Sequence, residues 1–408
     1  MKTDVVIIGG GAAGLCAAVY LKQKKPQFTV RILEALPRVG KKLIVTGNGR
    51  CNISNKQISL ECYHGKNKEF CRYALEKYNV SVSEEFFRSI GVPFIYEGNK
   101  AYPASLQAGS VVDCLRFMAE ELGVIIHTDT KVTNINTVGK DYKVIANKVS
   151  FIAKNVIIAT GGLAGGEKYG CDGSMFKILQ SAGFKMVKPL PTIVQIKTIN
   201  DITKQLKGIK IDAAVSLKRG AQILRSDYGE VLFTDYGLSG PPVMQISRDA
   251  ARFENLTVSL DIMNDVDYDK LFDTIVERIS IMKNRTLEEF FTGMFNKRLG
   301  QVILKMAGFK LSDSVSVLDE KAVKNIVKII KNMDFVVTGT TGFANAQATV
   351  GGLDTTAFDN LTMESFGCKN LYCVGEMLDI DGDCGGFNLQ WAWSSAMCAA
   401  ESIIGKNI

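Results

Sequence analysis

The feature that most constrains this sequence is a glycine-rich turn directly after a short apolar segment near its start. Residues 5–8 (VVII) are β-branched and apolar, as in a buried parallel strand. Residues 15–22 have helical composition. Between them lies a GxGxxG pattern made of small residues: Gly9, Gly11, Ala12, Ala13 and Gly14. Strand, glycine turn and helix in this order predict a loop whose backbone N–H groups and helix N-terminus face a phosphate group.

An acidic residue at the right distance strengthens this prediction. Residues 29–33 (TVRIL) read as a second strand, and Glu34 follows it, 20 residues after Gly14. A carboxylate at this place accepts hydrogen bonds from ribose hydroxyls in dinucleotide-binding units. The alternative is a glycine-rich turn that binds no ligand. The motif itself does not distinguish NAD from FAD.

Charge and composition narrow the function classes. The chain has 408 residues, enough for two or three domains. Its 49 Lys and Arg against 42 Asp and Glu give a net charge of +7, which could attract anionic partners. The basic residues are spread along the chain, and residues 190–345 carry nearly as many acidic as basic side chains. We therefore expect a small-molecule substrate and no nucleic-acid partner.

Cysteine and histidine usage bears on metals and on the compartment. Ten cysteines include no CxxC pair, and His64 and His127 are the two histidines. We expect no metal site and reduced thiols in the cytoplasm. The uncharged run 5–21 is short for a membrane span and is interrupted by glycines, so we expect neither a signal peptide nor a membrane anchor.

Three further segments have the character of ligand-binding loops. Residues 40–52 are basic and rich in glycine, and the alternative for them is a solvated surface loop. Residues 155–162 form another apolar strand that ends in glycines, without a second GxGxxG. Near the end, strand 371–374 leads into Gly375-Glu376, a loop over 379–386 and a long apolar helix over 387–404.

The rest of the chain alternates between helical and strand patterns. We expect helices over 66–90 and 109–122, a turn over 102–105 and a β-meander over 124–149. Short strands are expected at 193–196, 209–217, 221–224, 231–234 and 256–260. Residues 264–333 read as helical, with an apolar face on 322–330 that we assign to core packing.

These segments together resemble a family of flavoproteins with a two-dinucleotide-binding-type FAD fold and an inserted barrel. Its members are labelled aminoacetone oxidases or dehydro-bile-acid reductases. The resemblance rests on segments 6–14, 40–52, 159–162, 229–242 and 371–394. It implies an α/β fold: a discontinuous Rossmann-like FAD domain (1–189 and 345–408), an inserted β-barrel domain (190–262 and 333–344) and a small helical subdomain (263–332).

The resemblance also implies cofactor contacts. Glu34 is expected at the adenosine ribose, Val132 at the adenine through its backbone, and Glu376 at the ribityl chain or the pyrophosphate. Asn388 and Leu389 are expected at the isoalloxazine ring. The full set of expected FAD contacts is Gly9, Gly11, Ala12, Ala13, Gly14, Glu34, Ala35, Lys41, Lys42, Leu43, Gly49, Arg50, Cys51, Asn52, Val132, Ala159, Thr160, Gly161, Gly375, Glu376, Gly386, Phe387, Asn388 and Leu389.

A reaction follows as a hypothesis. We expect an FAD-dependent oxidoreductase that uses NADH or NADPH to reduce an activated C=C bond (an enone) in a small or steroid-like substrate. Candidate catalytic residues are Tyr236 and Tyr169 as proton donors and Arg50 as a ligand of a substrate carbonyl or carboxylate.

Several alternatives stay open at this stage. The protein could be a flavin oxidase of an amine with O₂ as acceptor, or a non-enzymatic or RNA-associated flavoprotein. Arg50, Tyr169 and Tyr236 could each be structural. Cys384 could be a redox partner of the flavin or a small buried thiol. A monomer and a homodimer are both compatible with the sequence.

Overall fold

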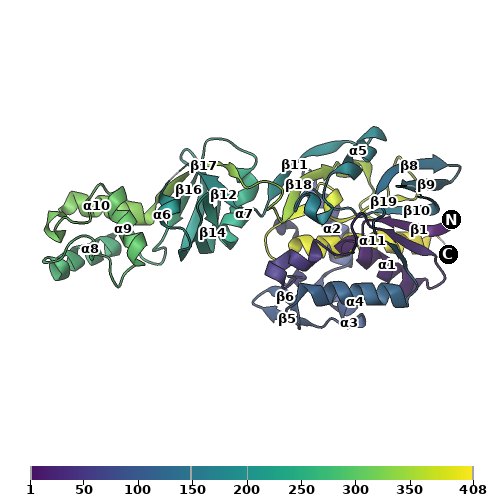
Figure 1. Cartoon of the computed structure of the whole chain (residues 1–408), viewed down its shortest axis with the longest axis horizontal. Coiled ribbons are helices and arrows are strands. Elements are labelled where there is room, and N and C mark those ends of the chain that lie inside the picture. Colours follow the sequence, from purple (N-terminus) through teal and green to yellow (C-terminus); the bar gives the residue numbers. More distant parts are fainter. Residues whose placement is uncertain (1, 148, 200, 407–408) are drawn as a thin grey trace. The chain divides into compact units, whose positions relative to one another are not determined.

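The computed structural model describes residues 2–147, 149–199 and 201–406, and the chain divides into two compact units (Figure 1). The first unit comprises residues 1–191 and 343–408, and the second comprises residues 192–342. The first unit is therefore discontinuous in sequence, with the second inserted into it. The predicted three-part division, with a separate helical subdomain, stays a prediction.

A mixed seven-stranded sheet forms the centre of the first unit, in the order β7-β2-β1-β10-β9-β8, with β19 also paired to β10. Strands β7, β2, β1, β10 and β19 run parallel, whereas β8, β9 and β10 form an antiparallel meander. The strand bounds are Lys2–Ile8 (β1), Val30–Leu33 (β2), Ile125–His127 (β7), Val132–Val138 (β8), Asp141–Ala146 (β9), Val149–Ile158 (β10) and Leu371–Cys373 (β19). The meander predicted over 124–149 is confirmed for β8, β9 and the start of β10, which continues into the parallel part of the sheet. Its first segment, β7, instead pairs parallel with β2.

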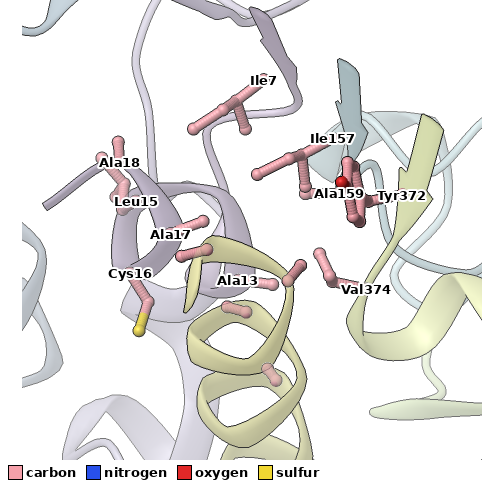
Figure 2. Close-up of a cluster of buried hydrophobic side chains, with 14 of the residues drawn as sticks. Ile7, Ala13, Leu15, Cys16, Ala17, Ala18, Ile157, Ala159, Tyr372 and Val374 are labelled. Atoms are coloured by element: carbon pink, nitrogen blue, oxygen red, sulfur yellow. The ribbon is translucent and has the colours of Figure 1, made fainter. Parts of the chain in front are cut away.

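Two helices pack closely beside this sheet. Helix α1 (Ala12–Lys24) follows the glycine turn, and helix α11 (Phe387–Gly405) closes the described chain. Figure 2 shows the two helices side by side, with small residues such as Ala13 and Ala17 between them and Ile7 and Ile157 on the neighbouring strands. Small side chains allow this close approach, which explains why most of α1 and α11 is buried.

Smaller elements surround this core. Helices α2 (Arg72–Lys77), α3 (Val80–Ser89) and α4 (Ala108–Glu121) confirm the helical prediction for the segments 66–90 and 109–122, whereas helix α5 (Ser174–Ser181) was not predicted. Strands β3 (Ser54–Asn55), β5 (Phe94–Glu97) and β6 (Lys100–Pro103) form one small sheet. Two further pairs are β4 (Tyr63–His64) with β20 (Asp381–Gly382), and β11 (Met186–Thr192) with β18 (Ala348–Leu353).

One local prediction for the first unit was wrong. Tyr102 and Pro103 end strand β6, where they pair with β5, and do not form a turn. Pro103 is tolerated because it occupies a strand end. The glycine-rich segment 40–52, predicted as a loop, contains short 3₁₀ turns over Leu43–Gly49. Gly47 and Asn48 adopt left-handed backbone angles, which interrupt regular structure there.

The second unit is built on a closed barrel in the order β12-β15-β14-β13-β16-β17. Its strands are Ile196–Thr198 (β12), Lys210–Arg219 (β13), Gln222–Phe233 (β14), Gly237–Ser239 (β15), Leu256–Asp261 (β16) and Met333–Thr340 (β17). The expected strands 221–224 and 231–234 are parts of the single long strand β14. The strand expected at 193–196 begins only at Ile196, where pairing with β15 and β17 starts.

Helices complete the second unit. Helices α6 (Ile202–Gln205) and α7 (Pro241–Ala250) were missed, because they lie within the region predicted as strands. For α7, Pro241 at the first helical position was a usable start signal. Helices α8 (Tyr268–Met282), α9 (Lys297–Met306) and α10 (Glu320–Lys331) follow. The apolar face of α10 is buried, as predicted, in a hydrophobic cluster shared with the barrel strands.

A buried polar cluster around Gln390 fixes the first turn of α11. The Gln390 amide oxygen accepts a hydrogen bond from Ser54 Oγ at 2.7 Å, and its amide nitrogen lies 2.9 Å from Tyr78 O and 2.8 Å from Ser83 Oγ. Gln390 is completely buried. Because an unpaired polar group in such a place is costly, this cluster sets the position of α11 against β3 and α3.

We predict that Gln390→Leu destabilises the first unit by about 2 kcal/mol or more, since Ser54 and Ser83 lose their partner. This corresponds to a fall of about 4 °C or more in the midpoint of thermal unfolding. Circular dichroism during a thermal scan measures it. The exposed Gln222→Leu in β14 is the matched control and should change the midpoint by about 1 °C or less. Equal midpoints for both variants would contradict the assigned role of the cluster.

Candidate functional site

The glycine turn after β1 has the geometry of a close-packed phosphate loop. Gly9 has φ +102°, and a Cβ there would lie 2.6 Å from Ala159 O. A Cβ on Gly14 would lie 2.0 Å from Gly9 O, so α1 could not pack against the turn. A Cβ on Gly11 would meet nothing within 4 Å. The turn is therefore packed against β10 on one side and open at Gly11, where a ligand has room to approach.

The N-terminus of α1 has donors to offer. Gly11 is its N-cap, no side chain caps the helix, and its first turn, which includes Ala12 and Ala13, contains no acidic residue. Backbone N–H groups in a first helical turn have no partner within the helix, and the helix dipole adds positive potential there. This arrangement fits the pyrophosphate of a dinucleotide.

Glu34 lies at the end of β2, where the ribose contact was predicted. Its carboxylate accepts hydrogen bonds from Gly10 N at 2.7 Å and from Leu36 N at 2.9 Å. Burial raises the pKa of Glu34, although hydrogen bonds from backbone N–H groups, including that of Ala35, act in the opposite direction and lower it. Each carboxylate oxygen can accept more than one hydrogen bond. Val132 begins β8 beside this segment, since Thr130 N donates to Glu34 O.

An ion pair connects the basic loop to the end of β19. Lys42 Nζ lies 2.6 Å from Glu376 Oε2. Burial opposes the charge of Lys42, but the nearby Glu376 carboxylate leaves the pKa of Lys42 raised. Glu376 Oε1 is buried without a partner in the described chain and faces the backbone at Gly162. A buried carboxylate oxygen without a donor fits a hydroxyl-bearing ligand such as a ribityl chain.

The segments around this pair also come together. Ala159, Thr160 and Gly161 follow β10, whereas Gly375 and Glu376 follow the neighbouring parallel strand β19. Gly375 is held against α11, because its N–H donates to Ser395 Oγ and its carbonyl accepts from Trp391 Nε1. Lys41 and Leu43 flank Lys42, and Leu43 is buried in the core. The expected contacts from these segments therefore lie at one edge of the sheet.

The N-terminus of α11 forms the second donor group. Its N-cap, Gly386, has φ +99°, a Cβ there would lie 2.4 Å from Ser54 O, and no side chain caps the helix. The Asn388 side chain is engaged with the preceding loop, bonding both Gly382 N (2.9 Å) and Gly382 O (2.8 Å). The backbone N–H groups of Phe387, Asn388 and Leu389 are therefore what this helix end presents to a ligand.

Asn52 gives an independent sign that something binds here. Its Oδ1 is buried without a partner in the described chain and lies beside Gly386, 2.9 Å from where a Cβ would stand. An acceptor next to uncapped backbone donors matches the alternating donors and acceptors of a flavin pyrimidine ring. The residues present thus fit the FAD that the family resemblance implies.

The catalytic candidates lie in different surroundings. Arg50 forms an ion pair with Glu97 and stacks 4.4 Å from the ring centroid of Tyr102. Tyr169 packs against Gly165 in a short 3₁₀ turn. Tyr236 belongs to the second unit, in the turn between β14 and β15. The structure therefore places Arg50 in the loop that leads to Asn52 and assigns Tyr236 to the other unit.

The thiols of this region differ in environment. Cys51 is fully buried, and burial raises its pKa to about 12, which makes it a poor nucleophile. Gly49, two residues earlier, has φ +81°. Cys384 is half-buried. Within the described residues, no group of three or more His, Cys, Asp or Glu could hold a metal ion.

Sequence reasoning missed other residues of the site. Thr349 Oγ1 accepts hydrogen bonds from Leu163 N and Ala164 N, both at 2.9 Å, and so shapes the loop after β10. His64 and Asp383 form a pair that the sequence separates by more than 300 residues. The scarcity of histidine was a usable signal for His64, whereas nothing in the local pattern around Thr349 pointed to this role.

We predict that Glu34→Gln weakens FAD binding about 10-fold or more, because a charge-assisted hydrogen bond to the ribose contributes roughly 1.5–3 kcal/mol. Fluorescence titration of the FAD-free protein measures the dissociation constant. FMN, which lacks the adenosine ribose, should bind both proteins equally. The exposed Glu61→Gln is the matched control. Unchanged FAD affinity in Glu34→Gln would contradict the ribose assignment.

Comparison with known proteins places this geometry in a family. A model of the HI0933-like protein Rossmann domain matches residues 3–402. The 3-dehydro-bile acid delta(4,6)-reductase of Clostridium scindens is 34% identical over 97% of this chain and 98% of its own length. The ribosomal RNA dihydrouridine synthase of Haemophilus influenzae is 29% identical over 98% of both chains, and that of Escherichia coli is 26% identical over 99% and 98%.

Solved structures agree on the fold. The 3-ketosteroid delta1-dehydrogenase of Sterolibacterium denitrificans superposes with a TM-score of 0.52 at 12% identity, covering 99% of this chain and all of that one. The FrdA subunit of Escherichia coli quinol fumarate reductase gives a TM-score of 0.52 at 14% identity, covering 100% and 70%. The described chain contains no helix that is both long and apolar enough to span a bilayer. With a family model that spans nearly the whole sequence and a relative 34% identical along it, the chain belongs to the HI0933-like Rossmann family of FAD-dependent oxidoreductases.

Proposed function

We propose that the protein uses NADPH or NADH to reduce a C=C bond conjugated to a carbonyl group in a small or steroid-like substrate. The observation that carries the proposal is the 34% identity, along almost the whole of both chains, to a relative named as a bile acid reductase. A cytoplasmic location and a monomeric or homodimeric state remain predictions.

The reactions that the relatives are named for belong to one chemical type. A 3-dehydro bile acid unsaturated at the delta-4 and delta-6 positions carries C=C bonds conjugated to its 3-oxo group. Dihydrouridine forms when the C=C bond of a uracil ring, which is also conjugated to a carbonyl, gains two hydrogens. Both reactions add a hydride to one carbon and a proton to the next. This supports an activated C=C bond as the reacting group. Which molecule contains that bond, a steroid-like compound or a uridine in RNA, is the point to test.

The chain's own residues prepare the site for this chemistry. Bound FAD supplies hydride exchange with the electron donor and the substrate. The uncapped N-terminus of α11 stabilises negative charge placed against it by on the order of 1 kcal/mol. Asn52 and Glu376 offer buried acceptors, and Lys42 holds Glu376 in place. Because the charge of Arg50 is already compensated by Glu97, Arg50 is better suited to hold its loop than to bind a substrate carbonyl.

A second candidate is reduction of uridine in RNA. It is favoured by two relatives named ribosomal RNA dihydrouridine synthases, which are 29% and 26% identical along nearly all of this chain, and by the net charge of +7. It revises the expectation that nucleic acid is not a partner. The alternative of an amine oxidase has no such support, and the test below includes the result that would favour it.

The test is an anaerobic titration of the purified FAD-bound protein, followed by its visible spectrum. We expect NADPH or NADH to bleach the flavin band, and 4-androstene-3,17-dione to restore it with stoichiometric loss of the enone absorbance. Restoration by a uridine-containing RNA, and not by the steroid, would favour the second candidate. A flavin that stays oxidised with both nucleotides, together with hydrogen peroxide formation from an amine in air, would overturn the proposal.

A further inference from the structure

His64 lies in a short ladder that leads directly to the start of α11. Strand β4 pairs antiparallel with β20, so that His64 stands opposite Asp381 and Tyr63 opposite Gly382. Tyr63 Oη donates to Phe387 O at 3.0 Å, which ties β4 to the first residue of α11. His64 is thus held in the same loop cluster as the uncapped helix N-terminus to which we assign the flavin.

A carboxylate holds the His64 ring. His64 Nε2 lies 2.8 Å from Asp383 Oδ1, and both side chains keep about a fifth of their surface exposed. Because an ionised carboxylate only accepts hydrogen bonds, Nε2 carries a hydrogen and Nδ1 is the nitrogen left to exchange a proton. Among the described residues, this is the one ion pair that joins a histidine to a carboxylate.

Asp383 is itself positioned from two sides. Its backbone N–H donates to Cys62 O at 2.9 Å, and its carbonyl accepts from Asn388 Nδ2 at 3.4 Å. Both bonds connect segments that flank the N-terminus of α11. The pair is therefore fixed to the helix end and does not lie on a free surface loop.

Other charged groups surround the ring. Glu61 lies near His64 and pairs with Lys68 at 2.9 Å. Lys66 follows His64 by two residues. Its backbone N–H donates a hydrogen bond to Asp379 Oδ2 at 2.8 Å, and its Nζ donates to Asp354 Oδ2 at 3.4 Å. Since Glu61 and Lys66 have partners of their own, Asp383 is the group that orients the imidazole.

We propose that His64, oriented by Asp383, donates the proton that completes reduction of the substrate C=C bond. This inference rests on the proposed function. Hydride, which bound reduced FAD would supply, forms a C–H bond at the carbon remote from the carbonyl as the π bond of the C=C bond breaks. The electron pair of that π bond then takes the proton from Nδ1–H of the doubly protonated His64 ring at the carbon next to the carbonyl. His64 is left neutral, with Nε2–H still bonded to Asp383, and regains a proton from water. Two electrons and two hydrogen nuclei are thus accounted for.

The first test measures the substrate step alone. The FAD-bound protein is reduced with dithionite, so that the identity of the natural donor does not matter, and is mixed anaerobically with 4-androstene-3,17-dione or with uridine-containing RNA. A positioned general acid contributes about 10²–10⁴-fold, so reoxidation should be about 100-fold slower in His64→Gln. His127→Gln removes the other histidine, whose ring lies beside Arg31 and Phe151, and should react within twofold of wild type.

The outcomes separate the two proposals. Equal rates for His64→Gln and wild type, with equal FAD content, overturn the role of His64 and leave the proposed function standing. If wild type is not reoxidised by either substrate, the proposed function fails as well. Asp383→Asn guards against loss of folding in His64→Gln, because it keeps the imidazole and should slow reoxidation by a smaller factor, about 10-fold.

A second readout needs no turnover. With two histidines in the chain, the imidazole ¹⁵N signals of the oxidised protein are assigned with His127→Gln alone. We expect Asp383→Asn to shift the Nε2 signal of His64, and addition of the steroid or the RNA to shift the signals of His64 and leave those of His127 unchanged. A His64 ring that responds to neither change would overturn the proposal.

Discussion

The parallel register of β2, β1, β10 and β19 is the constraint on which the whole site depends. Parallel strands present their carboxyl ends at one edge of a sheet, so the segments that follow them meet there. Those segments carry Gly9, Glu34, Ala159 and Gly375. Helices α1 and α11 pack side by side against this sheet and leave both N-termini without side-chain caps (Figure 2). Two uncapped helix ends beside buried acceptors without partners describe a fold shaped around an elongated ligand with an anionic centre.

Much of this architecture was predictable because its signals are local. The glycine turn, the strand before it and Glu34 lie within about 30 residues, and backbone geometry allows few alternatives at Gly9 and Gly14. The closing helix was predicted within one residue of its observed end because its apolar composition runs to Ile404. The apolar face of α10 was correctly assigned to core packing for the same reason.

The contacts that join distant segments could not be predicted in this way. Lys42 meets Glu376 across 334 positions, and His64 meets Asp383 across 319, so no short pattern encodes either pair. Strand β14 was divided in two because its polar middle, around Asp227, pairs with β13 although it reads as a turn. The helix α7 was hidden by the strand pattern on either side. In each case, partners supplied by the rest of the fold decided the local structure.

The most direct test of the central claim is a crystal structure of the FAD-bound protein. The account predicts the pyrophosphate against the first turn of α1, the adenosine ribose at Glu34, and the flavin ring at the N-terminus of α11, with hydrogen bonds to Asn52 Oδ1. FAD bound away from α1 and α11, or present while Asn52 Oδ1 and Glu376 Oε1 remain without partners, would contradict it.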